Sequence, residues 1–239
     1  MPVLPGYLAL AFGATTGLAA YLFYRATHRA GWVLAGLAGW ALLHSLLASR
    51  GFYLLTDGRP PRLALALAPP LLGLACLLAA PAGRRWLRGL HPGWLTLLHA
   101  VRLPVELVLL GLYLHGAVPR LLTFEGRNWD VAVGLSAPLV WYLAFRTRRL
   151  GPGALLAWHC AGLVLLLNVV TLAVLSVPSV VQRLAFDQPN VAVLRFPFVL
   201  LPAVVVPLVL LAHAAAICQL WPGRAAGRTA PTAAPLPAP

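Results

Sequence analysis

Residues 93–117 read GWLTLLHAVRLPVELVLLGLYLHGA, an apolar run interrupted by one arginine and one glutamate. The hydrocarbon core of a bilayer is about 30 Å thick, and a helix of roughly 20 apolar residues crosses it. The run is therefore long enough to span a membrane with Arg102 and Glu106 inside it. A central charge costs a few kcal/mol on insertion scales. We therefore expect both side chains to face other helices.

Apolar segments of similar length lie on both sides of this run. With it, they predict an all-α, polytopic integral membrane bundle whose transmembrane helices are residues 7–24, 31–49, 62–81, 93–117, 130–146, 153–177 and 195–220. Hydrophobic residues make up 61% of the chain and charged residues 10%, with a mean hydropathy of +0.85. Soluble domains are about 25% charged, so the composition excludes a water-soluble enzyme. We expect a seven-span domain over residues 1–221 and a disordered, Pro/Ala-rich cytoplasmic tail over residues 222–239.

The distribution of arginine predicts the orientation. The 18 basic residues are all arginine, so a retinal Schiff base on lysine is excluded. In a seven-span chain, the loops and tail on the side of the C-terminus contain no acidic residue. They contain ten arginines: Arg25, Arg29, Arg84, Arg85, Arg88, Arg146, Arg148, Arg149, Arg224 and Arg228. Cytoplasmic loops are rich in arginine, which indicates an outside N-terminus and a cytoplasmic C-terminus. Because these arginines lie mainly in short loops between spans, we expect no nucleic-acid partner.

Glycine and proline predict how the helices pack. Gly13 and Gly17 on the first span, and Gly31, Ala35 and Gly39 on the second, recur every four residues, a spacing that permits close backbone approach between membrane helices. Proline removes a backbone hydrogen bond and kinks a helix. The spans contain Pro69, Pro70, Pro104, Pro138, Pro197, Pro202 and Pro207.

One polar stripe runs along the fourth span. At 100° per residue, His99, Arg102, Glu106 and Tyr113 share one face of the helix. Arg102 and Glu106 are one turn apart, a spacing that allows an ion pair. In a functional site, Arg102 would hold an anionic group, Glu106 would bind or relay a proton, and His99 would pass it inward. In a structural role, the pair would fix the helix register. The sequence leaves both interpretations open.

Five further polar residues lie near this stripe or in the outward loops. Asn168, in the sixth span, either adds an amide to the stripe or bonds a neighbouring helix. Arg127 and Asp187 are candidates for a site at the outer face. Asp130 is interpreted as a helix cap, as is Asn190.

The histidines raise the alternative of haem. His44 and His115 lie near the outer ends of their spans, whereas His99, His159 and His213 lie in the inner halves, a layering that two bis-histidine haems need. However, His99 and His115 are turned by about 160° from each other on one helix. HExxH, HxxxH and CxxC are also absent from the sequence. We therefore expect no cofactor and no metal.

Several motifs resemble a known family. Arg102-Leu-Pro-Val-Glu106, Thr123-Phe-Glu-Gly-Arg-Asn-Trp-Asp130, Phe186-Asp-Gln-Pro-Asn190 and Phe196-Pro-Phe198 are similar to stretches of an uncharacterised family of bacterial seven-helix inner-membrane proteins. The resemblance covers roughly residues 60–220 and implies a multi-pass protein of the bacterial cytoplasmic membrane. That family has no assigned activity, so no functional residue follows from it.

Three functions are compatible with this sequence. The first is binding or translocation of a small polar or anionic solute, or of a proton, through a site centred on the fourth helix. The second is a membrane-embedded enzyme or b-haem redox protein that acts at the outer face. The third is a partner subunit or assembly factor without chemistry of its own. In each case the bilayer is the certain partner.

Overall fold

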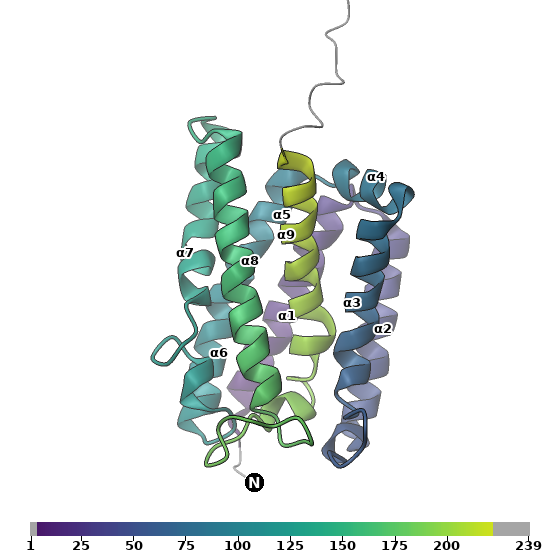
Figure 1. Cartoon of the computed structure of the whole chain (residues 1–239), viewed down its shortest axis with the longest axis vertical. Helices are drawn as coiled ribbons and strands as arrows, with labels where there is room; N and C mark the ends of the chain where they lie inside the picture. Colours follow the sequence, from purple (N-terminus) through teal and green to yellow (C-terminus); the bar gives the residue numbers. More distant parts are fainter. Residues whose placement is uncertain (1–3, 222–239) are drawn as a thin grey trace, which may run out of the picture.

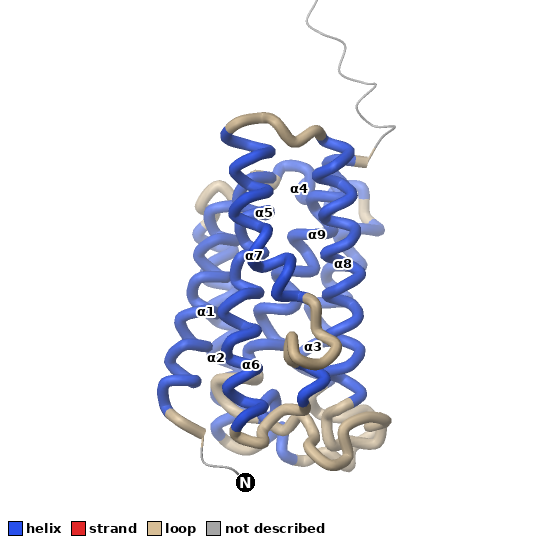
Figure 2. Tube along the Cα trace, turned by 90° about the vertical axis from the view of Figure 1, so that its left-hand side faces the viewer, coloured by secondary structure: helices blue, strands red, loops and turns tan. Residues whose placement is uncertain are grey.

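The computed structural model describes residues 4–221, so the tail predicted over residues 222–239 lies outside the described residues. Within residues 4–221 the regular structure is entirely helical. The long helices run side by side along the longest axis of the molecule (Figure 1). Most connecting loops lie at its two ends, whereas the loop that leads into α7 lies partway along the bundle (Figures 1 and 2).

Each predicted apolar range contains a helix. The helices are α1 (Gly6–Ala26), α2 (Gly31–Ser49), α3 (Ala64–Ala79), α5 (Pro92–Leu98), α6 (Arg102–Leu114), α7 (Asp130–Trp141), α8 (Pro152–Leu175) and α9 (Val206–Leu220). A 3₁₀ turn at His99–Val101 joins α5 and α6 into one rod. Five-residue π-helical segments, Tyr142–Arg146 and Leu201–Val205, extend α7 and precede α9.

Five of these helices are long and apolar enough to cross a membrane: α1, α2, Pro92–Leu114, α8 and Leu201–Leu220. The number rises to six if α3 and α4 (Pro81–Gly89), which are bent by 99° from each other, count as one span. This finding confirms an all-helical bundle with five or six helices that can span a membrane. The other predicted spans are short, because α3 alone has 16 residues and α7 has 12 before its π-helical extension.

Helix α4 begins at Pro81, the last residue of the predicted span 62–81, and lies mostly in the interval before the next predicted span, where no helix was expected from the sequence. It crosses the end of the bundle near the end of α9 (Figure 1). Two features fix the bend. Nη1 of Arg84 donates to the carbonyls of Leu78 and Ala79 at the end of α3, at 2.7 and 2.5 Å. At Gly83, a Cβ atom would lie 2.3 Å from the carbonyl oxygen of Leu77, so only glycine fits.

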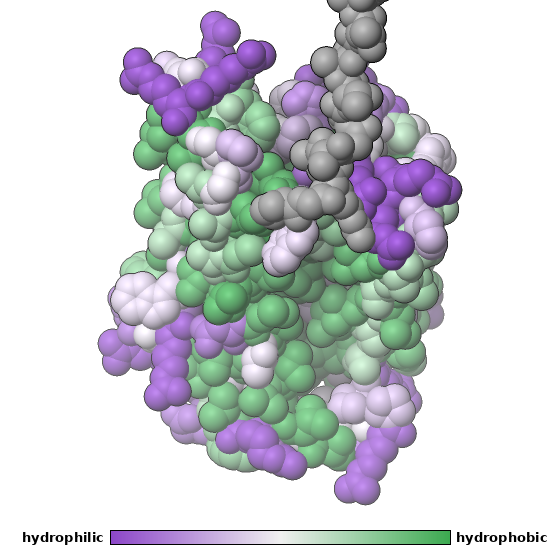
Figure 3. Space-filling view, turned by 45° about the horizontal axis from the view of Figure 1, so that its top comes forward, coloured by the Kyte–Doolittle hydropathy of each residue, from purple (hydrophilic) through white to green (hydrophobic). Residues whose placement is uncertain are grey.

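An apolar band covers the middle of the bundle on the face drawn in Figure 3. Figure 3 shows hydrophobic side chains over the middle of the face and hydrophilic ones at its two ends. Large side chains within the helices point outward, among them Leu10 of α1 and Leu72 of α3, which are 77% and 65% exposed. A continuous apolar surface of this kind is the surface that a bilayer covers.

Proline shapes α9 as expected, and a side chain from α2 completes the kink. Pro207 has no N–H group for the carbonyl of Ala203, four residues earlier. Nε1 of Trp40 donates to that carbonyl at 2.9 Å. The backbone group that proline frees is therefore satisfied inside the bundle, as the membrane interior requires.

The close helix contacts are not at the predicted glycines. At Gly13, Gly17, Gly31 and Gly39 a Cβ atom would have no neighbour within 4 Å, so the prediction of close approach there is wrong. A tight contact with the backbone of a neighbouring helix is at Gly134 of α7, where a Cβ atom would lie 2.5 Å from the backbone nitrogen of Leu103 in α6. Four-residue spacing alone does not show which helix face meets a neighbour.

We therefore expect Gly134→Ala to destabilise the bundle, because backbone atoms of α6 cannot move aside for a methyl group. Overpacking typically costs about 1–3 kcal/mol, and thermal unfolding in detergent measures the loss. The matched control is Gly36→Ala on α2, where a Cβ atom meets nothing within 4 Å. Equal unfolding temperatures for the two variants would disprove the close contact.

Candidate functional site

A buried ion pair lies at the start of α6 and α7. Arg102, 3% exposed, donates from Nε to Oδ2 of Asp130 at 2.9 Å and from Nη2 to Oδ1. This two-point contact is the strongest geometry for such a pair. The predicted ion pair between Arg102 and Glu106 is therefore wrong. Asp130, interpreted from sequence as a cap, lies in the first turn of α7 and neutralises Arg102 from another helix.

The remaining N–H groups of Arg102 are also bonded. Nη1 and Nη2 each donate to the carbonyl of Gly162 in α8 at 3.2 Å, and Nη1 contacts Nε2 of His213 in α9 at 3.1 Å. A guanidinium group has five N–H donors, and here all five have partners. Arg102 thus joins four helices and has no donor left for an anionic ligand.

Glu106 has a different environment, one turn further along α6. Its side chain is 1% exposed, and Oε1 accepts a hydrogen bond from Nδ2 of Asn128, whereas Oε2 has no hydrogen-bond partner. Asn128 also donates to the carbonyl of Leu122 at 3.0 Å and accepts from the backbone N–H of Asp130 at 3.0 Å. Asn128 therefore connects Glu106 with the ion pair without supplying a positive charge.

A small cavity of about 60 Å³ lies beside Glu106. Arg102, Asp130, Asn128 and Asn190 contribute its polar wall, and apolar residues of α8 and α9 form most of the rest. Asn190 donates to the carbonyl of Ala173 and does not cap a helix, and its Oδ1 has no partner. Two buried acceptor oxygens without donors thus belong to the wall of one cavity, which has room for about two water molecules.

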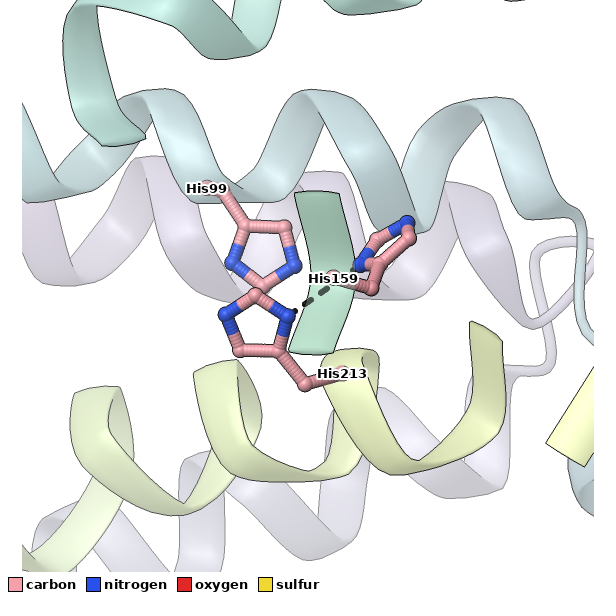
Figure 4. A group of neighbouring side chains, drawn as sticks. All are labelled: His99, His159 and His213. Atoms are coloured by element: carbon pink, nitrogen blue, oxygen red, sulfur yellow. Dashed lines mark hydrogen bonds between the residues drawn. The ribbon is translucent and has the colours of Figure 1, made fainter. Parts of the chain in front are cut away.

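Three histidines meet on the other side of Arg102. His99 of the 3₁₀ turn, His159 of α8 and His213 of α9 are all 0% exposed. Figure 4 shows their rings converging from three helices. The His99 and His213 rings stack at 3.8 Å between centroids, and Nδ1 of His159 lies 3.1 Å from Nδ1 of His213. We call these three residues the histidine triad.

Hydrogen-bond donors define the tautomers of two triad members. Because arginine only donates, Nε2 of His213 accepts, and its Nδ1–H donates to Nδ1 of His159. The proton of His159 is then on Nε2, which lies 3.4 Å from the hydroxyl of Thr96. That hydroxyl donates to the carbonyl of Pro92 at 3.1 Å. A directed chain therefore runs from Arg102 to Pro92 at the start of α5, and both nitrogens of His99 stand outside it without partners.

Local backbone features make room for the triad. Pro104 has no N–H group for the carbonyl of Ala100, and the rod tightens into the 3₁₀ turn that carries His99. At Gly162 a Cβ atom would lie 2.6 Å from Cε1 of His213. Glycine at position 162 therefore leaves space for the His213 ring, and the carbonyl of Gly162 accepts hydrogen bonds from Arg102.

Four of the seven predicted site residues lie elsewhere. Asn168 is exposed and donates to the carbonyl of Arg127 at 3.0 Å, so it bonds a neighbouring segment and does not join the stripe. Tyr113, Arg127 and Asp187 line a separate hollow of about 610 Å³, which we call the outer hollow because the sequence predicts that these loops face outward. Of the seven predicted site residues, only His99, Arg102 and Glu106 belong to the buried network.

Sequence analysis missed Asn128, Asp130 and Asn190 as members of this network. One signal for Asp130 was present, since a membrane-buried arginine needs an acid and Asp130 begins the next apolar run. His159 and His213 were considered only as haem ligands. The direct stacking of His99 on His213 leaves no space for a porphyrin between these rings, while His44 bonds Tyr53 and His115 bonds the carbonyl of Gly111.

The apolar band, the spanning helices and a polar network enclosed between them define a multi-pass membrane protein. The model of a domain of unknown function (DUF8737) matches residues 60–221, and the chain belongs to this family. The matched region contains the whole buried network. No curated protein and no solved structure matches the chain.

Proposed function

We propose that the protein is a seven-span protein of the bacterial cytoplasmic membrane that binds and translocates protons through Glu106. The topology is supported by the positions of the chain ends, because α1 begins and α9 ends at opposite ends of the bundle (Figure 1). An odd number of crossings follows if α3 and α7 also span. The arginines of α4 and of the turn after α7 lie at the end where α9 finishes, and an excess of arginine supports a cytoplasmic position for that end.

The absence, within residues 4–221, of a cationic partner for the buried side chain of Glu106 is the observation that carries the proposal. Arg102 is neutralised by Asp130 on both carboxylate oxygens, so Glu106 has no counter-charge of its own. An isolated carboxylate is costly in an apolar interior unless it gains a cation or a proton. Its free oxygen and the adjoining cavity give a proton or a water molecule a place to bind.

The same geometry favours a proton over a larger solute. An anionic solute would need donors from Arg102, all of which are already bonded within the protein. The cavity of about 60 Å³ is close in size to two water molecules and smaller than an organic metabolite. Of the ligands considered from sequence, the proton is the one that fits.

The network supplies a path on each side of the ion pair. On the outer side, Glu106 and Asn190 share the cavity wall. On the inner side, the chain of His213, His159 and Thr96 can accept a proton at one end and release one at the other. The Arg102–Asp130 pair, which is neutral overall, lies between the two halves and contacts both of them, through Asn128 on one side and His213 on the other.

Proton flux into liposomes tests this function. The purified full-length protein is reconstituted with an internal pH-sensitive dye, and a potassium gradient with valinomycin imposes the membrane potential. We expect Glu106→Gln to lower the flux to that of protein-free liposomes, because glutamine cannot exchange a proton. Membrane abundance should stay near normal, since the Gln side-chain oxygen still accepts from Asn128.

Glu125→Gln is the matched control, because Glu125 is an exposed acid of the outer loop and lies outside the buried network. Its flux should equal that of the wild type. The proposal would be refuted if the dye reported no acidification inside liposomes that contain the wild-type protein. It would also be refuted if the proton flux of Glu106→Gln equalled that of the wild type.

A further inference from the structure

We propose that the histidine triad binds one transition-metal ion of the class that prefers imidazole ligands, with Zn²⁺ as the representative. His99, His159 and His213 each offer a ring nitrogen, and these three donor atoms lie within 4.8 Å of one another. Imidazole nitrogen is a common ligand for zinc and for copper, iron and nickel. Three ligands from three helices leave one position of a tetrahedral ion open to water or another ligand.

His99 supplies the strongest argument for a missing partner. It is fully buried, yet neither ring nitrogen has a hydrogen-bond partner. The ring stacks on His213 and packs edge-on against Trp158, at 5.5 Å between centroids. Buried polar atoms in native proteins nearly always have a partner, an ordered water or an ion. A metal ion bound by all three imidazoles would give a ring nitrogen of His99 the partner that it lacks within the protein.

The other two ligands already have suitable spacing. Nδ1 of His159 and Nδ1 of His213 are 3.1 Å apart. Two nitrogens at 2.0–2.1 Å from one tetrahedral ion would be about 3.3 Å apart. Nε2–H of His159 points to the hydroxyl of Thr96, so the lone pair of Nδ1 is directed toward His213. Hydrogen bonds of this kind, from the non-ligating nitrogen, orient metal-bound histidines.

Metal binding requires one change at His213. Its single ring proton moves from Nδ1 to Nε2, so the ring stays neutral and Nδ1 becomes a ligand. Nε2 then carries a hydrogen and can no longer accept from Nη1 of Arg102, so these two N–H groups must turn away from each other. Arg102 keeps its bonds to Asp130 and to the carbonyl of Gly162. The ion also occupies the position of the proton shared by His213 and His159. Bound metal therefore interrupts the inner proton path, a consequence that rests on the proposed function, whereas metal binding itself does not.

Metal titration tests the site directly. The full-length protein is purified in detergent, stripped with a chelator and titrated with Co²⁺, whose visible bands report tetrahedral coordination. Zn²⁺ then competes for the site, and elemental analysis gives the stoichiometry. We expect one ion per chain. His99→Leu should weaken binding by about 100-fold or more, since the loss of outer-shell partners alone costs 10–100-fold.

Two comparisons keep the result independent of folding and of proton flux. His99 makes no hydrogen bond to the protein, so His99→Leu should unfold at the same temperature as metal-free wild type, and Zn²⁺ should raise that temperature only in the wild type. His115→Leu, at the outer end of α6, should bind Co²⁺ like the wild type. The site is disproved if wild type gives no cobalt bands and retains no zinc, or if His99→Leu binds as tightly. Proton flux enters none of these readouts.

Discussion

Asp130→Asn is expected to remove most of the folded protein from the membrane. The substitution keeps the shape of the side chain but leaves Arg102 as an uncompensated charge that is 3% exposed. Removing one partner of a buried ion pair costs about 3–5 kcal/mol. Whole domains are stable by only about 5–15 kcal/mol, so this loss is a large share of the total. Abundance in isolated membranes and thermal unfolding in detergent measure it.

Asp187→Asn is the control for this experiment, because Asp187 is an exposed acid of the outer hollow. Its abundance and unfolding temperature should match those of the wild type. If Asp130→Asn is as abundant and as stable as Asp187→Asn, the ion pair does not hold the bundle together.

The second large effect is a rescue. Combining Arg102→Leu with Asp130→Leu should restore much of the abundance that either single substitution removes, because no buried charge then remains unpaired. Buried ion pairs can often be replaced by apolar residues at little cost in stability. We expect incomplete recovery, since the carbonyl of Gly162 loses its Arg102 donors and an unsatisfied buried group costs about 1–3 kcal/mol.

A double-mutant cycle analyses the same four proteins quantitatively. The stability changes of substitutions at independent sites add to within about 0.5 kcal/mol. The coupling energy between Arg102 and Asp130 should be larger than this value. A double variant that is as unstable as the sum of the two single variants would show that each residue acts separately, contrary to the structure.

The sequence was most informative where a single helix carries the signal. Apolar runs longer than a bilayer is thick predicted the helices, and the 100° rotation per residue correctly placed His99, Arg102 and Glu106 in the interior. Helix α4 was missed because a nine-residue helix is too short for the hydropathy of a span. Pro81 at its first turn, a favoured position for proline, was the available signal.

Partners across helices could not be found in this way. Spacing in sequence relates Arg102 to Glu106 on one helix, but the acid that neutralises Arg102 is 28 residues away at the start of the next span. The histidine triad comes from three helices, so it matches no short metal motif. Which residues meet depends on how the helices pack, and a single hydropathy profile does not contain that information.

Infrared spectroscopy of the protein in lipid tests the central claim most directly, because the carbonyl stretch of a protonated carboxylic acid can be followed as the pH changes. The account predicts a band in the wild type that appears and disappears with pH, is absent from Glu106→Gln and is unchanged in Glu125→Gln. The same titrating band in Glu106→Gln, or no titrating band in the wild type, would contradict it.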